Sequence, residues 1–159
     1  MEQQTHNPEE LAQKAASSIL TSLGYQYTLE ISSNDEGVEL MINSPDARFL
    51  IGDEGDRLDD LQYLVNRLVQ AEWEDAPRVR VDCDHYRARA EAKLLRRARS
   101  RAERVLQTGK PLLMEKLNAY QRRLVHNDLA QIPGMVTASE DTESRFKRIT
   151  ISKKEEPCD

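Results

Sequence analysis

Hydrophobic and polar residues recur with two different periods along the first half of the 159-residue chain. After Asn7 and Pro8, which are typical of a helix start, apolar residues recur every four positions at Leu11, Ala15, Ile19 and Leu23. This spacing predicts a helix that ends before a glycine. Two strands are predicted at residues 25–32 and 38–43, where apolar and polar residues alternate, with hairpin-turn residues between them.

The middle of the chain predicts two further helices around a glycine-containing loop. A short helix is expected at 47–51 and a strongly apolar helix from 58 to about 73, with Gly-Asp-Glu-Gly between them. A strand at 78–83 follows, in which Cys83 lies on the apolar side. We interpret Cys83 as a small buried hydrophobic side chain rather than a reactive one. The first half therefore has the order helix, strand, strand, short helix, Gly-x-x-Gly, helix, strand.

The second half begins with an uninterrupted helix-forming run, Tyr86–Thr108. An apolar stripe is predicted on it at Ala90, Leu94, Ala98, Ala102 and either Val105 or Leu106. Beyond the break at 109–111, the sequence predicts a short strand at 112–115. A helix at 118–131 follows, which starts with a capping box of Asn118 and Gln121. The last predicted element is a hairpin of strands at 135–139 and 145–152, joined by the acidic loop 140–143.

Charge is distributed unequally between the two halves. Residues 1–86 hold 6 Lys or Arg against 18 Asp or Glu, a net of −12, whereas residues 87–159 hold 17 against 10, a net of +7; the two sum to the overall −5. A basic half suggests a surface that faces phosphates. Five basic residues of the long helix are predicted mostly beside or opposite its apolar stripe: Arg89, Lys93, Arg96, Arg97 and Arg104. The alternative is a solvated helix face, or arginines that pair with the acidic half.

The change of sign favours two small domains, at residues 8–84 and 85–152, with flexible ends at 1–7 and 153–159. No apolar run approaches the roughly 18 residues of a membrane span, and the N-terminus lacks a signal-peptide pattern, so we expect a cytoplasmic protein. Neither the histidines nor Cys83 and Cys158 have metal-ligand spacing, and no nucleophile or P-loop motif is present. The sequence therefore predicts no enzyme, no cofactor and no metal.

The sequence from Phe49 to Asn66 resembles the KH signature of the bacterial Jag (SpoIIIJ-associated, KhpB-like) proteins, I-G-x-x-G-x-x-L-x-x-L-Q-Y-L-V-N. This resemblance implies an α+β fold with a type II KH domain. In such a domain the two glycines, here Gly52 and Gly55, let a nucleic-acid backbone approach closely. Family members usually have Lys or Arg between the glycines, whereas this chain has Asp53 and Glu54, which repel phosphate. We therefore expect a scaffold, or a face for protein binding or dimerisation, ahead of nucleic-acid contact by this loop.

Residues 118–126, N-A-Y-Q-R-R-L-V-H, resemble the R-three-H motif N-x-Y-E-R-R-x-x-H, with Gln in place of the usual Glu. Arg122 and His126 are one helical turn apart, so the arginine can offer its planar fork to phosphate oxygens and the histidine a donor or a stacking ring beside it. The alternative is a solvated helix face, or a histidine whose hydrogen bond is satisfied within the sheet. Arg123 points about 100° away, toward a neighbouring phosphate or solvent. Tyr120 is the best candidate for stacking on a base, although a tyrosine at a helix start is as often a core residue. Lys147 and Arg148 on the last strand extend the basic patch.

Together the resemblances imply a protein that binds RNA or single-stranded DNA, as a post-transcriptional regulator or adaptor. A small KH-only protein or a homodimer through the KH domain is the implied protein partner, and the N-terminal Jag domain of many relatives is absent from this sequence. The long helix is expected to join the two domains and to place a basic surface beside Arg122 and His126. The competing hypothesis is a protein-interaction adaptor whose acidic first half binds a basic protein.

Overall fold

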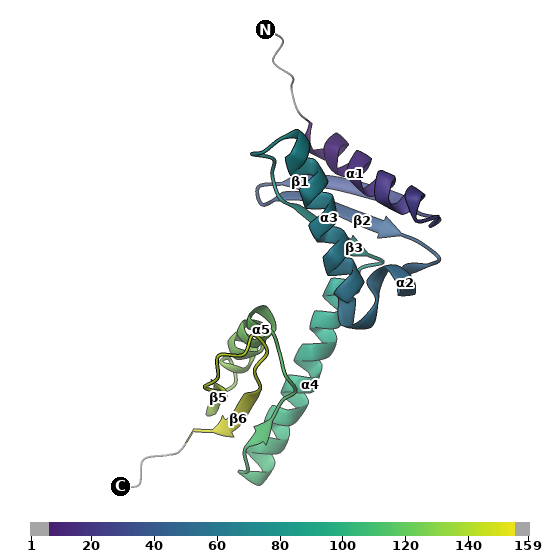
Figure 1. The fold of residues 1–159 in the computed structure, drawn as a ribbon. Coiled ribbons are helices and arrows are strands. Elements are labelled where there is room, and N and C mark those ends of the chain that lie inside the picture. Colours follow the sequence, from purple (N-terminus) through teal and green to yellow (C-terminus); the bar gives the residue numbers. More distant parts are fainter. Residues whose placement is uncertain (1–6, 155–159) are drawn as a thin grey trace. The chain divides into compact units, whose positions relative to one another are not determined.

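A computed structural model describes residues 7–154, which form two compact units that divide between Ala88 and Arg89. Each unit has its own three-stranded sheet and its own cluster of buried hydrophobic side chains. The protein is thus α+β, as expected (Figure 1). Residues 1–6 and 155–159, where flexible ends were expected, lie outside the described part of the chain.

The first unit follows the predicted order of elements. It contains α1 (Pro8–Ser22), β1 (Thr28–Asn34), β2 (Gly37–Asn43), α2 (Ala47–Ile51), a 3-10 turn (Asp53–Gly55), α3 (Asp56–Glu72) and β3 (Val79–Cys83). The central strand is β2, antiparallel to β1 and parallel to β3. The predicted start of β1 at residue 25 is wrong, because β2 ends at Asn43, which pairs with Thr28 and leaves no ladder partner before it.

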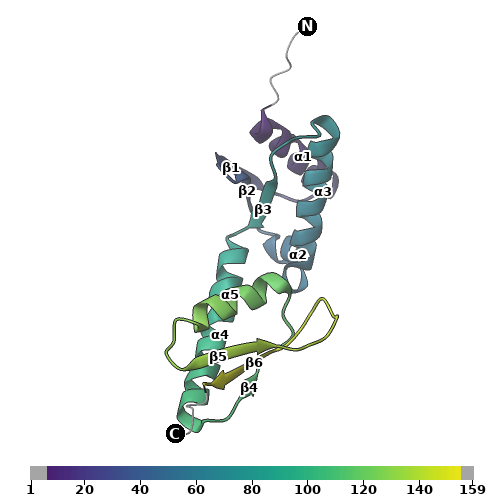
Figure 2. The same ribbon diagram turned by 90° about the vertical axis from the view of Figure 1, so that its left-hand side faces the viewer.

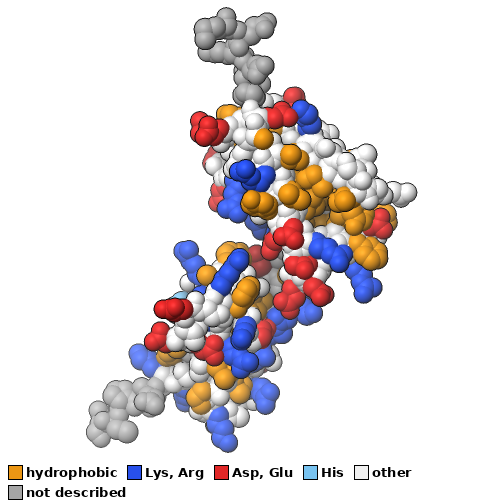
Figure 3. Space-filling model, in the orientation of Figure 1, with side chains coloured by type: hydrophobic (Ala, Val, Ile, Leu, Met, Phe, Trp, Pro, Cys, Tyr) orange, Lys and Arg blue, Asp and Glu red, His pale blue; other side chains and the backbone are white. Residues whose placement is uncertain are grey.

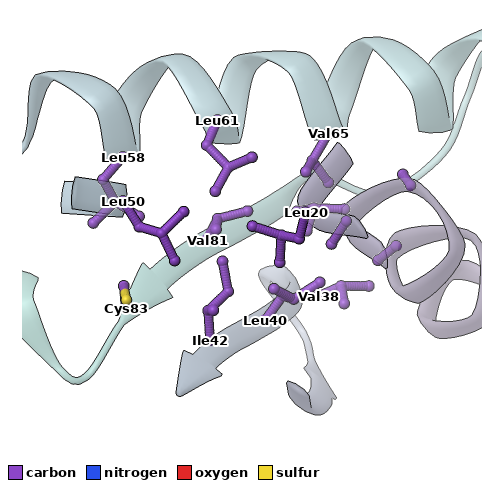
Figure 4. Packing of buried hydrophobic residues seen from close by; sticks show 14 of the residues in the cluster. Leu20, Val38, Leu40, Ile42, Leu50, Leu58, Leu61, Val65, Val81 and Cys83 are labelled. Atoms are coloured by element: carbon purple, nitrogen blue, oxygen red, sulfur yellow. The ribbon is translucent and has the colours of Figure 1, made fainter. Parts of the chain in front are cut away.

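α1 and α3 cover one face of this sheet (Figures 1 and 4). Leu58, Leu61 and Val65 of α3 point toward Val81 of β3 and Ile42 of β2 in the close-up (Figure 4). All five are buried, and burying one such side chain contributes about 1.5–3 kcal/mol. Cys83, at the end of β3, is also buried, as interpreted from the sequence.

The buried face of α1 matches the predicted one only in part: Ala15 is buried and Leu11 and Ile19 pack against the core, but the centre of the buried face lies beside them. Ala12, Ala16 and Leu20 are fully buried, together with Ala15, whereas Leu23 is 64% exposed. A spacing of four residues advances about 40° around a helix at each step, so the last member of the predicted stripe, Leu23, has turned away from the core. Asn7 caps α1 as expected, its side-chain oxygen accepting the Glu9 N–H at 3.0 Å.

The second unit takes up α4 (Tyr86–Thr108) from Arg89 onward. It continues with β4 (Leu112–Leu113), α5 (Ala119–Leu129), β5 (Met135–Ser139) and β6 (Ile149–Lys153). β6 is the central strand and is antiparallel to both neighbours (Figure 2). Of the two candidates for the end of the α4 stripe, Val105 is buried and Leu106 is 41% exposed.

The last strand is shifted from its prediction. β6 begins at Ile149 rather than at residue 145, because Glu140 and Arg148 close the β5–β6 connection: the Glu140 N–H donates to the Arg148 carbonyl at 3.1 Å. At its other end β6 continues to Lys153, and the Lys154 N–H donates to the Gly134 carbonyl at 2.8 Å. The sheet therefore extends past Ser152, where the flexible tail was expected to follow.

Candidate nucleic-acid interface

The start of α5 is fixed by the predicted capping box. The Asn118 side-chain oxygen accepts the Gln121 N–H at 2.8 Å, and the Gln121 side-chain oxygen accepts the Asn118 N–H at 3.0 Å. Val125 and Leu129 then bury one face of the helix in the core. The cap and these two side chains together set the rotation of α5, and with it the direction in which Arg122 and His126 leave the helix.

Arg122 fastens α5 to two loops. Its Nη1 donates to the Leu117 carbonyl at 2.8 Å and to the Arg145 carbonyl at 3.3 Å. Leu117 is itself paired with Lys147 through both backbone hydrogen bonds, at 2.9 and 3.0 Å. Arg122 is therefore a half-buried structural residue as well as a cation, and its Nε and Nη2 have no partner among residues 7–154.

His126 is exposed and is held by the neighbouring strand. Its Nδ1 lies 2.6 Å from the Thr137 hydroxyl of β5. This bond orients the imidazole, and Nε2 has no partner in the described part of the chain. Arg122 and His126 thus share the side of α5 that faces β5 and the β5–β6 connection, as their spacing predicted.

The β5–β6 connection adds cations to this side of the unit. The backbone of Lys147 is bound to Leu117, the residue whose carbonyl Arg122 contacts. The Arg148 N–H donates to the Glu140 carboxylate at 3.0 Å, so an acid lies within the predicted basic patch. Arg145, which the motif did not single out, reaches the site through its carbonyl. Its signal in the sequence was its place in the run Arg145-Phe146-Lys147-Arg148.

Tyr120 does not lie beside Arg122 and His126. Its hydroxyl donates to the Glu91 carboxylate of α4 at 2.9 Å. Residues 120 and 122 leave a helix about 200° apart, so Tyr120 faces α4 while Arg122 faces the sheet edge. Proximity in sequence was misleading here, because two residues separated by two positions on a helix are on nearly opposite sides. Arg123 is exposed.

Several arginines of α4 are engaged within the second unit. Arg97 and Arg101 contact the Glu115 carboxylate at 2.7 and 3.2 Å, and Arg99 pairs with Asp128 of α5. Hydrogen bonding from Arg99 holds the pKa of Asp128 below its ordinary value. These acids belong to the second unit and not to the acidic first half. Among the described ion pairs of α4, only that between Arg87 and Asp59 joins an arginine to the acidic half, as the sequence predicted.

Arg89, Lys93 and Arg96 are exposed and have no ion-pair partner among the described residues. Their side chains leave α4 on the side opposite its buried stripe. Tyr120 and Asp128 of α5 contact Glu91 and Arg99 of α4, so the side of α5 that faces α4 is not the side that carries Arg122 and His126. The expected basic surface beside Arg122 and His126 is therefore wrong for these three residues. The structure gives the second unit two basic surfaces instead of one.

The Gly52–Gly55 loop of the first unit is shaped by internal packing. Both glycines have positive φ, and a Cβ on Gly55 would lie 2.7 Å from Cε1 of Tyr86. Asp53 and Glu54 are exposed, and Glu54 itself has a φ of 50°. Burial, and then the charges of Glu54 and Asp59, raise the pKa of Tyr86. The two glycines thus have a structural explanation that needs no ligand.

Within residues 7–154, no group of three or more His, Cys, Asp or Glu side chains is arranged to hold a metal ion. None of the helices described is both long and apolar enough to cross a membrane.

Comparison with known proteins places the second unit in a known class. Residues 92–153 match the model of the R-three-H domain, from within α4 to the end of β6. The second unit is thus an R-three-H domain, built on the Arg-x-x-x-His spacing of α5.

The whole chain also has relatives. It is 32% identical over 135 residues to the RNA-binding protein KhpB of Clostridium symbiosum, which covers 85% of this chain and 60% of that protein. It is 29% identical over 122 residues to the RNA-binding protein KhpB of Lactiplantibacillus plantarum, covering 77% of this chain and 38% of that one. The chain therefore spans less than two thirds of either relative. It belongs to the KhpB/Jag-like family.

Proposed function

We propose that this protein binds RNA or another single-stranded nucleic acid through its second unit, as a post-transcriptional regulator or adaptor. The observation that carries the proposal is the side of α5 where Arg122 and His126 lie together, next to a connection that contains Arg145, Lys147 and Arg148. Two relatives named as RNA-binding proteins support it.

The chemistry of the site suits a phosphodiester backbone. Arg122 keeps two nitrogens of its fork for phosphate oxygens, and the oriented imidazole of His126 adds a donor or a ring beside them. Because Nη1 already holds two carbonyls, the fork is fixed before the ligand arrives and loses little freedom on binding. We assign Lys147, Arg148 and Arg123 to the same surface.

Arg89, Lys93, Arg96 and Arg97 form the second basic surface, on α4. We propose that it contacts the nucleic acid only when the strand is long enough to pass around the unit. Arg97 contributes less than the others, because Glu115 neutralises part of its charge. Tyr120 remains a candidate for stacking on a base at the junction of α4 and α5, where its hydroxyl contacts Glu91, and it belongs to neither basic surface.

The test is binding of a fluorescently labelled single-stranded RNA, measured by anisotropy as a function of salt. A surface that neutralises four to six phosphates gives a log–log slope of about −3 to −4. R122A/H126A should weaken binding about 10- to 100-fold, the loss expected for one or two charged hydrogen bonds. K110A is the matched control, because Lys110 is an exposed cation of the same unit that belongs to neither surface. Equal loss in the two variants would refute the assignment of the pair.

A second proposal concerns the first unit, which we take to be the KH-like domain at residues 8–84. α3 exposes Tyr63, Leu64 and Leu68 at 44–64% of their surface. Hydrophobic and acidic side chains lie next to one another on this face of the unit (Figure 3). Such a surface suits a protein partner that carries basic residues, rather than a nucleic acid. We propose that the Gly52-Asp53-Glu54-Gly55 loop belongs to this protein-binding half.

The two proposals separate in one crosslinking experiment in cells. L64S/L68S should abolish protein crosslinks from the first unit and leave RNA crosslinks in the second unit unchanged, because both leucines are exposed and contribute little to the core. D53K/E54K tests the loop directly. Increased RNA affinity would show that the loop is a nucleic-acid groove that lacks only charge.

A further inference from the structure

Phe146 is an exposed aromatic residue that the core of the second unit does not use. Its side chain is 48% exposed, and it does not belong to the buried cluster of that unit or to the partly buried residues packed against it. It lies in the β5–β6 connection, which projects beyond the ends of its strands (Figure 2). Part of its ring is therefore available for contact with a ligand.

The backbone on both sides of Phe146 is held in place. The Arg145 carbonyl accepts from Nη1 of Arg122, and Lys147 is paired in both directions with Leu117. The Phe146 N–H donates to the Ser144 hydroxyl at 3.3 Å. Because the backbone around Phe146 is held by hydrogen bonds, the exposed ring can bind a ligand with little loss of conformational freedom.

The charge around the ring favours a base over a phosphate. The Arg145 guanidinium carbon lies 5.7 Å from the centroid of the ring, within the range of a cation–π contact. Glu140, Asp141 and Glu143 offset part of the charge of the three cations in the same connection, and the phenyl ring itself has no hydrogen-bond donor for a phosphate oxygen. Aromatic rings and arginine planes are the groups on which unpaired bases stack.

We propose that Phe146, with Arg145 beside it, is a stacking platform for an unpaired nucleobase of the strand whose backbone the Arg122 and His126 side of α5 binds. This inference rests on the proposed function and extends it. Arg122 then acts twice: it offers its fork to phosphate, and through the Arg145 carbonyl it positions the platform. The expected ligand is single-stranded, since bases in a duplex are already stacked.

The experiment compares two labelled 12-mers of equal charge, oligo-uridine RNA and an abasic ribose-phosphate strand, on the full chain. F146A should weaken binding of the oligo-uridine about 5- to 100-fold, the loss of one stacked base, and leave binding of the abasic strand unchanged. The salt slope should be the same for F146A and the unchanged protein, because no phosphate contact is lost. F146W should restore binding, and L113A is the matched control, since Leu113 is a similarly exposed apolar residue of the same unit at 52%.

Each other outcome overturns a specific claim. If the unchanged protein binds neither strand, the proposed function and the platform both fall. If it binds oligo-uridine and F146A binds equally well, the platform alone is overturned, and Phe146 is then free for contact with a protein. Equal loss on both strands would also overturn stacking, because an abasic strand has nothing to stack.

Discussion

At the scale of single residues, the site depends on Arg122 more than its motif suggests. The Arg-x-x-x-His spacing presents Arg122 as a ligand for phosphate, but its Nη1 is committed to the carbonyls of Leu117 and Arg145. His126 is similarly held by Thr137. Both functional candidates are thus oriented by contacts that belong to the fold.

R122K separates charge from geometry. Lysine keeps the cation but lacks the planar fork, so it cannot hold two carbonyls and meet a phosphate together. We expect R122K to lower stability by about 1.5–3 kcal/mol, the range for hydrogen bonds to a charged group, and to bind RNA nearly as poorly as R122A. Urea unfolding and anisotropy measure the two effects. Affinity equal to that of the unchanged protein would mean that only the charge matters.

Gly55 gives a test of the packing explanation for the Gly-x-x-Gly loop. G55A combines a positive φ of 86° with a Cβ only 2.7 Å from Tyr86, whereas G24A has a positive φ of 79° and nothing within 4 Å. Both variants strain the backbone, and G55A adds a steric clash. We expect G55A to be less stable than G24A by about 1–3 kcal/mol in urea unfolding. Equal losses would remove Tyr86 from the explanation.

Asp128 should contribute stability that depends on pH. Hydrogen bonding from Arg99 lowers the pKa of Asp128 in the folded state. Its stabilising effect is therefore full above the unfolded pKa of about 3.9 and is lost as pH falls through the lowered folded pKa. D128N should melt below the unchanged protein at neutral pH, and the difference should shrink in acid below about pH 4. A difference in Tm that is constant with pH would indicate that the ion pair is not its cause.

At the scale of elements, α5 is the helix that decides the site. Its capping box fixes where it starts, its buried face fixes its rotation, and Arg99 of α4 ties its far end through Asp128. β5 and the β5–β6 connection then supply the partners of His126 and Arg122. The site is the place where one helix meets one strand edge and one loop.

N118A tests this control by the helix cap. Losing the side-chain acceptor for the Gln121 N–H should cost about 0.5–2 kcal/mol and loosen the first turn, from which Arg122 projects. N127A is the control, because Asn127 is exposed on the same helix outside the cap. Urea unfolding should show a loss for N118A only. An RNA affinity that falls with N118A would connect the cap to the site, whereas equal stability of the two variants would contradict a stabilising cap.

At the scale of the whole molecule, the two basic surfaces of the second unit predict a dependence on ligand length. Arg122 and Lys93 are on different helices and leave them on different sides, so a strand that reaches both must pass around two helices of about 10–12 Å each, a path longer than about 20 Å. A stacked 6-mer extends about 20 Å, and a 30-mer about 100 Å. K93A/R96A should therefore weaken binding of a 30-mer and leave binding of a 6-mer nearly unchanged. Equal weakening for both lengths would place all the cations in one site.

The sequence by itself determined the elements and most of the core. Apolar periods of two and of about four predicted the order of helices and strands in both units, and local side-chain chemistry predicted the caps of α1 and α5. These signals are local, since a cap or a strand depends on residues a few positions apart. The position of Arg122 and His126 on one side of α5 followed from the same short-range geometry.

What only the tertiary structure decided depends on partners far apart in sequence. The start of β1 was set by the end of β2, and the start of β6 by the pairing of Glu140 with Arg148. The angle between Tyr120 and Arg122 follows from the helix itself, but only the tertiary structure decided that the Tyr120 side of α5 faces Glu91 of α4. Arg145 is part of the site because its backbone carbonyl accepts a hydrogen bond from Arg122, and a backbone carbonyl is the same in every residue and gives no signal in a sequence. Long-range pairing and backbone contacts of this kind are set by packing, and no periodicity encodes them.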